Sequence, residues 1–387
     1  MVVTRANRFL ALLFFALSGV GHAAVLPEDR TDVLYHSYDG GGIQINGPSI
    51  LVRKGDEKSF SVFANYYADN ITSASIDVQV SGASQYTENR NEYTLGVDYL
   101  HDKTTISFAH TTSLENDFDA GSSHFSISQD MFGDLTTISL GYSQGDDIIR
   151  TSTDPTFEEN ADRKNYRVGI TQVLTKDLLA QFSHETITDE GFLNNPYRSV
   201  RYIDDSGATP YLDASFAPEI YPNTRTSSAN AIRMRYYLPY RAAIHFEYRV
   251  FNDTWGIDAT IMELGYTHPF GDRWIMDLRY RLYEQTAADF YSDLFPFANS
   301  QNFMARDKEL STYTDSTIGA GISYEFIKNG WNFIDKGSVN FNIDHIQFDY
   351  DDFRDARETD SLGIDAGTES LYSFSANVIR FFVSIWY

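Results

Sequence analysis

Charged side chains gather in four consecutive segments in the second half of the chain, many of them two residues apart. Side chains at alternate positions of an extended segment lie on one face, so these residues are predicted to form one wall of a lumen. Two interpretations stay open: a selectivity wall, whose arginines favour anions, and a salt-bridge network that fills the interior. The residues are Arg233, Arg235, His245, Glu247, Arg249, Asp258, Glu263, Asp277, Arg279 and Arg281.

An acidic stretch near the C-terminus could supply carboxylate oxygens to Ca²⁺. Its candidate ligands are Asp349, Asp351, Asp352 and Asp355. The chain lacks a twelve-residue loop with the expected glycine and terminal glutamate, so no dedicated metal site is predicted. The alternative is a solvated external surface that meets lipopolysaccharide phosphates through shared divalent cations.

Catalysis is not predicted. A hydrolase needs a nucleophile, a base and an orienting group together. His36-Ser37 and His184-Glu185 are neighbours in the chain, but no third partner accompanies either pair. We therefore expect neither an enzyme nor a cofactor.

The last residues point to the elements that would position the charged wall. Phe381, Val383, Ile385 and Tyr387 place an apolar side chain at every second position up to the end of the sequence. A strand with one fully apolar face at this place is typical of the closing strand of an outer-membrane barrel.

The N-terminus predicts export. Arg5 and Arg8 precede an apolar run over residues 9–17, and Gly21-His22-Ala23 fits a signal-peptidase site. The sequence therefore predicts a signal peptide over residues 1–23 and a barrel over residues 24–387. The apolar run is shorter than the ~20 residues that a transmembrane helix requires.

Composition agrees with an all-β membrane protein. The chain has 26 Tyr, 28 Phe and no Cys, and its formal net charge is -24. Barrels have moderate mean hydropathy because only every second strand residue faces lipid. The absence of cysteine excludes disulfides, and the negative charge argues against nucleic acid as a partner.

Periodicity predicts sixteen antiparallel strands of an up-and-down transmembrane barrel, or fourteen without the hairpin over residues 32–53. Tight connections alternate with long ones over residues 191–228, 285–309 and 351–371. Short turns are periplasmic in such barrels, so both termini are predicted to be periplasmic. One strand changes phase, and a bulge near Asp344 and His345 would keep its apolar residues facing lipid. Trp255 is expected in an aromatic girdle.

Two long loops are expected to do more than connect strands. Residues 191–228 contain four prolines and four tyrosines, so they could fold into the lumen as a constriction or form an external cap. Residues 285–309 carry five aromatic side chains, which could pack on the first loop or hold an apolar ligand.

The chain resembles an uncharacterised family of bacterial outer-membrane proteins, described as domain of unknown function 3570. The resemblance rests on Gly47-Pro48-Ser49, on the C-terminal aromatic strand and on a motif after the third strand. The motif residues are Asp69, Thr72, Ser73, Ala74 and Ser75, with Ser73 where the family usually has glycine. The resemblance implies a barrel, and genes for FMN-transferase-like and thioredoxin-like proteins nearby, but no activity.

These features together predict a channel or substrate conduit in the outer membrane that is partly closed by residues 191–228, folded into the lumen. Expected partners are the membrane with its lipopolysaccharide, the barrel-assembly machinery and a periplasmic protein. The alternative is a non-conducting scaffold whose turn over residues 325–336 docks a soluble redox or maturation partner. A sixteen-stranded barrel generally encloses water, which favours the conduit.

Overall fold

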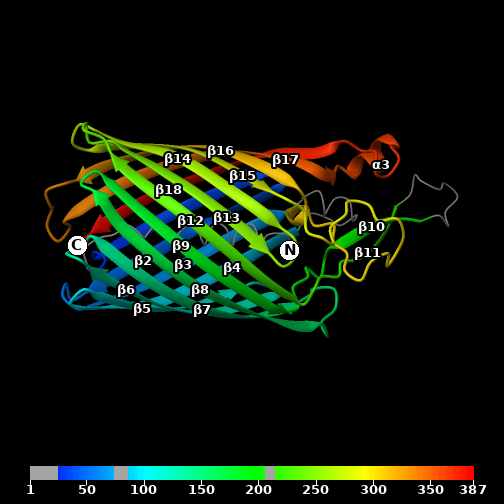
Figure 1. Ribbon diagram of the computed structural model, residues 1–387, viewed down its shortest axis with the longest axis horizontal. Coiled ribbons are helices and arrows are strands. Elements are labelled where there is room, and N and C mark those ends of the chain that lie inside the picture. Colours follow the sequence, from blue (N-terminus) through cyan, green and yellow to red (C-terminus); the bar gives the residue numbers. More distant parts are fainter. Residues whose placement is uncertain (1–24, 74–85, 205–213) are drawn as a thin grey trace.

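The computed structural model describes residues 25–73, 86–204 and 214–387, and it shows a closed antiparallel barrel (Figure 1). The first strand, β1 (Arg30–Gly40), pairs with β2 (Ile43–Gly55) and also with the last strand, β18 (Leu371–Trp386). Strand β9 (Leu178–Gly191) pairs with β12 (Thr224–Tyr237), because the hairpin of β10 and β11 lies outside the barrel. The predicted sixteen-stranded barrel is confirmed.

The remaining strands each pair with their neighbours in the chain. They are β3 (Phe60–Ser73), β4 (Tyr86–His101), β5 (Thr104–Leu114), β6 (Phe118–Met131), β7 (Thr136–Arg150), β8 (Glu158–Thr175), β13 (Ala243–Asp253), β14 (Asp258–Phe270), β15 (Trp274–Gln285), β16 (Tyr313–Ile327) and β17 (Lys336–Arg354). No helix among the described residues is long and apolar enough to cross a membrane.

The two ends of the barrel differ. At one end, called here the short-turn end, strands are joined by tight turns that use left-handed backbone, as at Asp102 (φ 51°), Gly133 (φ 69°) and Gly271 (φ 57°). Arg30 and Trp386 pair at this end, so the first and last strands begin and finish there. The opposite, long-loop end carries the long connections. Assignment of the short-turn end to the periplasm stays a prediction.

The outer surface is apolar because alternate strand residues point away from the lumen. Leu95 is 67% exposed and Ile318 is 65% exposed, values typical of side chains that meet lipid rather than protein. Phe381 and Val383 of β18 pair with Tyr35 and Val33 of β1 on this outer face. Ile385 continues their alternation. Tyr387 follows the strand, and its hydroxyl donates to the Arg53 carbonyl oxygen (3.3 Å).

The predicted bulge near Asp344 and His345 is wrong. Strand β17 keeps an unbroken register with β16 through this region, with His345 opposite Ile318 and Asp344 opposite Gly319. The apolar residues that follow therefore point inward instead of toward lipid. Tyr350 forms part of a buried cluster with Phe353 and Tyr372 inside the long-loop end. Their burial against each other compensates for the missing lipid contact.

A cap lies beyond the strands at the long-loop end (Figure 1). We use this name for the described residues among 191–223, 254–257, 286–312 and 351–370. It contains the hairpin of β10 (Ser199–Ile203) and β11 (Ala214–Pro218), the single turn η2 (Lys308–Leu310) and the short helix α3 (Arg357–Leu362). The prediction that residues 191–228 constrict the lumen is wrong for this hairpin, which lies outside the barrel.

Candidate functional site

Apart from Asp258, the residues of the predicted charged wall face the lumen, and five of them form ion pairs. Arg233 on β12 lies opposite Glu247 on β13 and donates to both carboxylate oxygens, at 2.7 and 3.0 Å. Arg249 shares the same carboxylate at 3.7 Å. Arg281 on β15 binds Asp315 on β16 at 3.0 Å. The side chains of these arginines are about one quarter exposed, so they also contact lumen space.

One ion pair of the charged wall joins two strands that are not neighbours. Arg279 on β15 binds Asp344 on β17 at 2.7 Å, and Arg380 on β18 binds the other oxygen of Asp344 at 2.6 Å. The strand between them, β16, has Gly319 in this row. A Cβ at Gly319 would overlap the Asp344 carboxylate, so this glycine gives the two side chains room to meet.

The remaining members of the wall differ from this pattern. Arg235 lies opposite His245 and has no ion pair among the described residues. The His245 ring lies over Gly265, where a Cβ would overlap it. Asp277 accepts a hydrogen bond from Thr267 (2.5 Å), and Glu263 lies opposite both Glu247 and Arg281.

Asp258 does not belong to the lumen wall, so this part of the prediction was wrong. It is the first residue of β14 and is exposed. Asp258 lies an even number of residues from Met262 and Leu264, so it shares their outward face. These two side chains are 45% and 54% exposed. Glu263 lies on the opposite face. An offset of one residue along a strand places a side chain on the opposite face.

The facing wall is lined by small hydroxyl side chains. Strands β5, β6 and β7 carry serine or threonine at several of their inward positions. These residues are Ser107, Thr111, Ser122, Ser126, Ser128, Thr137, Ser139 and Ser143. They remain exposed or half-buried although the barrel encloses them. These short side chains fill less of the lumen than the arginines of β12 to β15 do.

A buried ionic cluster joins the first four strands. Asp69 on β3 is 1% exposed and accepts His36 Nε2 of β1 at 2.7 Å. It also binds Arg90 of β4 at 2.6 Å. The Tyr67 ring stacks on His36 with centroids 4.7 Å apart, and its hydroxyl lies 3.0 Å from Nε2. Sequence reasoning singled out Asp69 as a motif residue but missed its partners.

A glycine allows β2 to approach β3 closely beside His36. Gly47 of β2 lies opposite His36, and a Cβ there would overlap the Ala68 carbonyl oxygen. Of the other motif residues, Thr72 lies opposite Gln44, and Ser73 is fully buried opposite Ile43. Ala74 and Ser75 lie outside the described residues.

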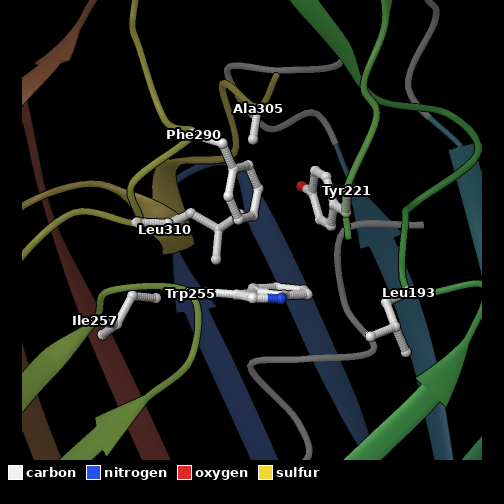
Figure 2. Close-up of a cluster of buried hydrophobic side chains, with 8 residues drawn as sticks. Leu193, Tyr221, Trp255, Ile257, Phe290, Ala305 and Leu310 are labelled. Atoms are coloured by element: carbon white, nitrogen blue, oxygen red, sulfur yellow. The ribbon is translucent and has the colours of Figure 1, made fainter. Parts of the chain in front are cut away.

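An aromatic core stabilises the cap (Figure 2). The rings of Trp255, Phe290 and Tyr221 meet edge to face or tilted, with centroids 5.2 to 5.5 Å apart. These three side chains come from three different connections, and Leu310 of η2 packs against them. Trp255 is 2% exposed, so it belongs to this core and not to an aromatic girdle as predicted. The prediction that residues 285–309 pack on the preceding loop is confirmed for Phe290.

Buried ion pairs hold the connections of the cap together. Arg201 of β10 is 1% exposed and binds Asp293 (2.8 Å) and Glu369 (2.5 Å), which come from two other connections. Arg306 also binds Asp293, at 2.9 Å. Arg198 binds Asp307 at 2.5 Å. Pairs that are both charged and fully buried require this mutual neutralisation, so the connections form one folded unit.

Glu219 is the group in this network with a strongly shifted pKa. Burial, and secondly the charge of Asp307, raise the pKa of its carboxyl to about 7. The Glu219 carboxylate accepts hydrogen bonds from Tyr221 Oη at 2.6 Å and from the Arg306 backbone N–H at 2.7 Å. These hydrogen bonds lower the pKa, but they offset the effect of burial only in part. The carboxyl is therefore close to half ionised at neutral pH.

The predicted Ca²⁺ candidates do not form a metal site. Asp355 binds Arg357 at 2.5 Å, and Asp352 accepts the Thr312 backbone N–H at 2.9 Å. Within the described ranges, no group of three or more His, Cys, Asp or Glu side chains is arranged to hold a metal ion.

Comparisons with known proteins agree with this architecture. A family model described as protein of unknown function (DUF3570) matches residues 78–336. No curated protein matches the sequence. A bacterial polysaccharide outer membrane secretin superposes with a TM-score of 0.50 and 7% identity, over 93% of this chain and 99% of its own. At that identity the likeness supports the fold alone.

Two further structures are similar at lower scores. A loop-deleted form of OmpT, an outer membrane protein of Vibrio cholerae, has a TM-score of 0.43 and 10% identity, over 94% of this chain and 100% of its own. The CymD monoaromatic hydrocarbon channel has a TM-score of 0.43 and 9% identity, over 94% and 89%. The closed barrel and its apolar outer surface place the protein in a bacterial outer membrane.

Proposed function

The chain belongs to the DUF3570 family, and from this premise we propose that it is an outer-membrane conduit for small hydrophilic solutes. The observation that carries the proposal is the lining of the lumen. Hydroxyl side chains on β5 to β7 face arginines on β12 to β15, and both sets keep contact with solvent-accessible space. A barrel filled only for stability would bury these groups, whereas sixteen strands can enclose water.

The paired charges favour a conduit with weak selectivity. Arg233, Arg279 and Arg281 each bind a carboxylate, so their charges are largely compensated. The salt-bridge interpretation of the wall therefore holds for these residues. Arg235 has no such ion pair among the described residues, and we propose that it provides the local preference for anions.

The cap determines when the conduit is open. Its aromatic core and buried ion pairs form a folded unit at the long-loop end. We propose that solute passage requires displacement of the cap. Replacing residues 194–220 by a short Gly/Ser linker removes the β10–β11 hairpin together with Arg201 and should raise single-channel conductance in a planar bilayer. Heat-modifiable migration on gels shows that the barrel of each form is folded. If neither folded form conducts ions, the conduit proposal is contradicted.

A matched pair of variants tests selectivity. Arg235→Gln removes an arginine with no ion pair and should shift the reversal potential in a salt gradient toward cations. The double variant Arg233→Gln/Glu247→Gln removes a compensated pair and should leave the reversal potential unchanged. Equal shifts, or no shift in either variant, would remove Arg235 from the proposal.

We also propose that the protein is not an enzyme. His36 and Asp69 form a buried pair of the kind found in hydrolases. Within the described residues, no serine or threonine hydroxyl hydrogen-bonds His36, so this pair has no activated nucleophile. Hydrolysis of a soluble ester that stops on His36→Gln substitution would contradict this.

A second candidate function is a scaffold, favoured by one observation at the short-turn end. The connection between β16 and β17 presents Trp331 and Phe333, which are 71% and 73% exposed. Large aromatic side chains at an exposed turn are typical of interaction sites. A photo-crosslinking residue at position 333 should then capture a periplasmic protein in cells. Crosslinks to lipid alone would leave the aromatic turn as a membrane anchor.

A further inference from the structure

A groove on the surface of the cap has no part in the proposed conduit. It has a volume of about 310 Å³ and is lined by Pro222, Thr254, Trp255, Asp289, Phe290, Gln301, Asn302 and Phe303. This volume is within the range of small-molecule sites, about 300–1,000 Å³. Three connections of the cap contribute to it, so its shape depends on the folded cap.

The floor of the groove is a rigid aromatic surface. Trp255 and Phe290 are 2% and 6% exposed, and their rings pack edge to face with centroids 5.2 Å apart (Figure 2). Trp255 Nε1 donates to the Thr224 carbonyl oxygen at 2.9 Å, which fixes the orientation of the indole. Phe303 stands beside this floor, 6.5 Å from Phe290, and is 42% exposed. The exposed ring that a ligand would meet is therefore that of Phe303, while the buried rings of Trp255 and Phe290 hold the base of the groove rigid.

The rim of the groove is polar and nearly neutral. Gln301 and Asn302 are exposed, and their amides offer both hydrogen-bond donors and acceptors. Asp289 supplies one carboxylate. It sits against Gly256, whose φ of 88° and missing Cβ leave room for the carboxylate. Thr254 adds a hydroxyl, which already accepts the Thr226 backbone N–H at 3.0 Å.

This combination selects among ligand classes. Anions are disfavoured because the one charged group in the lining is a carboxylate. A cation would require more carboxylates to replace its hydration, and an alkyl chain would use none of the hydrogen-bonding groups of the rim. A sugar ring satisfies both parts, because its C–H face packs on an aromatic ring while its hydroxyls bind amides and a carboxylate. We propose that the groove binds a neutral saccharide ring. This inference does not rest on conduction.

The test is calorimetric titration of the mature protein in nanodiscs or in a detergent without a sugar head group. The probes are glucose, N-acetylglucosamine, maltose and cellobiose, with inorganic phosphate and spermidine as charged comparisons. Saturable binding of at least one sugar is expected. Phe303→Ala and Asn302→Ala should each weaken it at least about fivefold. Phe297→Ala is the matched control, since Phe297 is also exposed (59%) but does not line the groove.

Trp255 provides a second measurement at the same site. The other three tryptophans, Trp274, Trp331 and Trp386, lie in strands or turns at the short-turn end. Sugar binding should therefore change the Trp255 emission, and the change should persist in a Trp331→Phe variant. No saturable heat with any sugar, binding unaffected by Phe303→Ala, or tighter binding of phosphate or spermidine would each overturn the proposal. Heat-modifiable migration of every variant confirms that the barrel is folded.

Discussion

Substituting Asp69 by asparagine tests the energetic role of the cluster that joins β1, β3 and β4. The asparagine side chain would keep the shape of the carboxylate and one acceptor oxygen, but it would remove the negative charge. Arg90 is 6% exposed and would then be buried without a carboxylate, and His36, also 6% exposed, would lose its charged acceptor. The barrel is otherwise unchanged.

The expected loss of unfolding free energy is large. Removing one partner of a buried ion pair typically costs ~3–5 kcal/mol, because the other charge is left uncompensated. Because the asparagine amide retains one acceptor oxygen, we expect a loss near the lower end of this range, at about 3 kcal/mol of unfolding free energy. Asp134→Asn is the matched control. Its pair with Lys103 (2.6 Å) is exposed, and such surface pairs contribute roughly 0–1 kcal/mol.

The measurement is reversible urea unfolding of each variant in zwitterionic micelles, followed by tryptophan emission and by heat-modifiable migration. The double variant Asp69→Leu/Arg90→Met removes both charges and should recover much of the stability that the single variant loses. If Asp69→Asn costs no more than Asp134→Asn, the buried charges do not stabilise the barrel. If the double variant is as unstable as Asp69→Asn, an uncompensated charge is not the cause.

Three other substitutions test different parts of the structure. Gly47→Ala should lower the unfolding free energy in the same urea assay, because its Cβ would overlap a backbone carbonyl, whereas Gly121→Ala has room and should cost little. Leu95→Arg places a charge in lipid and should cost ~2–4 kcal/mol, while Ser126→Arg in the lumen should be tolerated. The pKa of Glu219 is raised from its usual 4.5 to about 7, so the folded cap retains a proton that the unfolded cap releases. The contribution of Glu219 to the stability of the cap is therefore fully present below pH 4.5 and is lost as the pH rises through about 7. Hydrogen exchange of the cap, corrected for intrinsic rates, should be faster at about pH 8 than at about pH 5, and Glu219→Gln should remove that difference.

Alternation predicted the barrel and most of its lumen-facing charges, because the two-residue period is a local property of the chain. It failed where apolar side chains meet protein instead of lipid. Tyr350 continues an apolar alternation on β17, but it packs inside the long-loop end. Hydrophobicity alone does not distinguish these two apolar environments, so the predicted bulge was wrong.

The partners of the charged side chains could not be predicted from the sequence, for a different reason. Arg279 and Asp344 lie on strands that are not neighbours, and they meet because Gly319 has no side chain. Arg201 and Glu369 are 168 positions apart and come from connections without any periodic pattern. Residue type suggested that such charges find partners, but only the folded chain determines which ones.

The inward-facing glycine opposite His36 also limits how the barrel can assemble. A shift of one residue between β1 and β2 would place Asn46 or Pro48 opposite His36 in place of Gly47, and it would turn the imidazole away from Asp69. A first strand in the wrong register would thus leave His36 without its carboxylate acceptor, although Asp69 would keep its pair with Arg90. The cluster therefore favours the observed register of β1, a role that matters only while the protein is being inserted into the membrane.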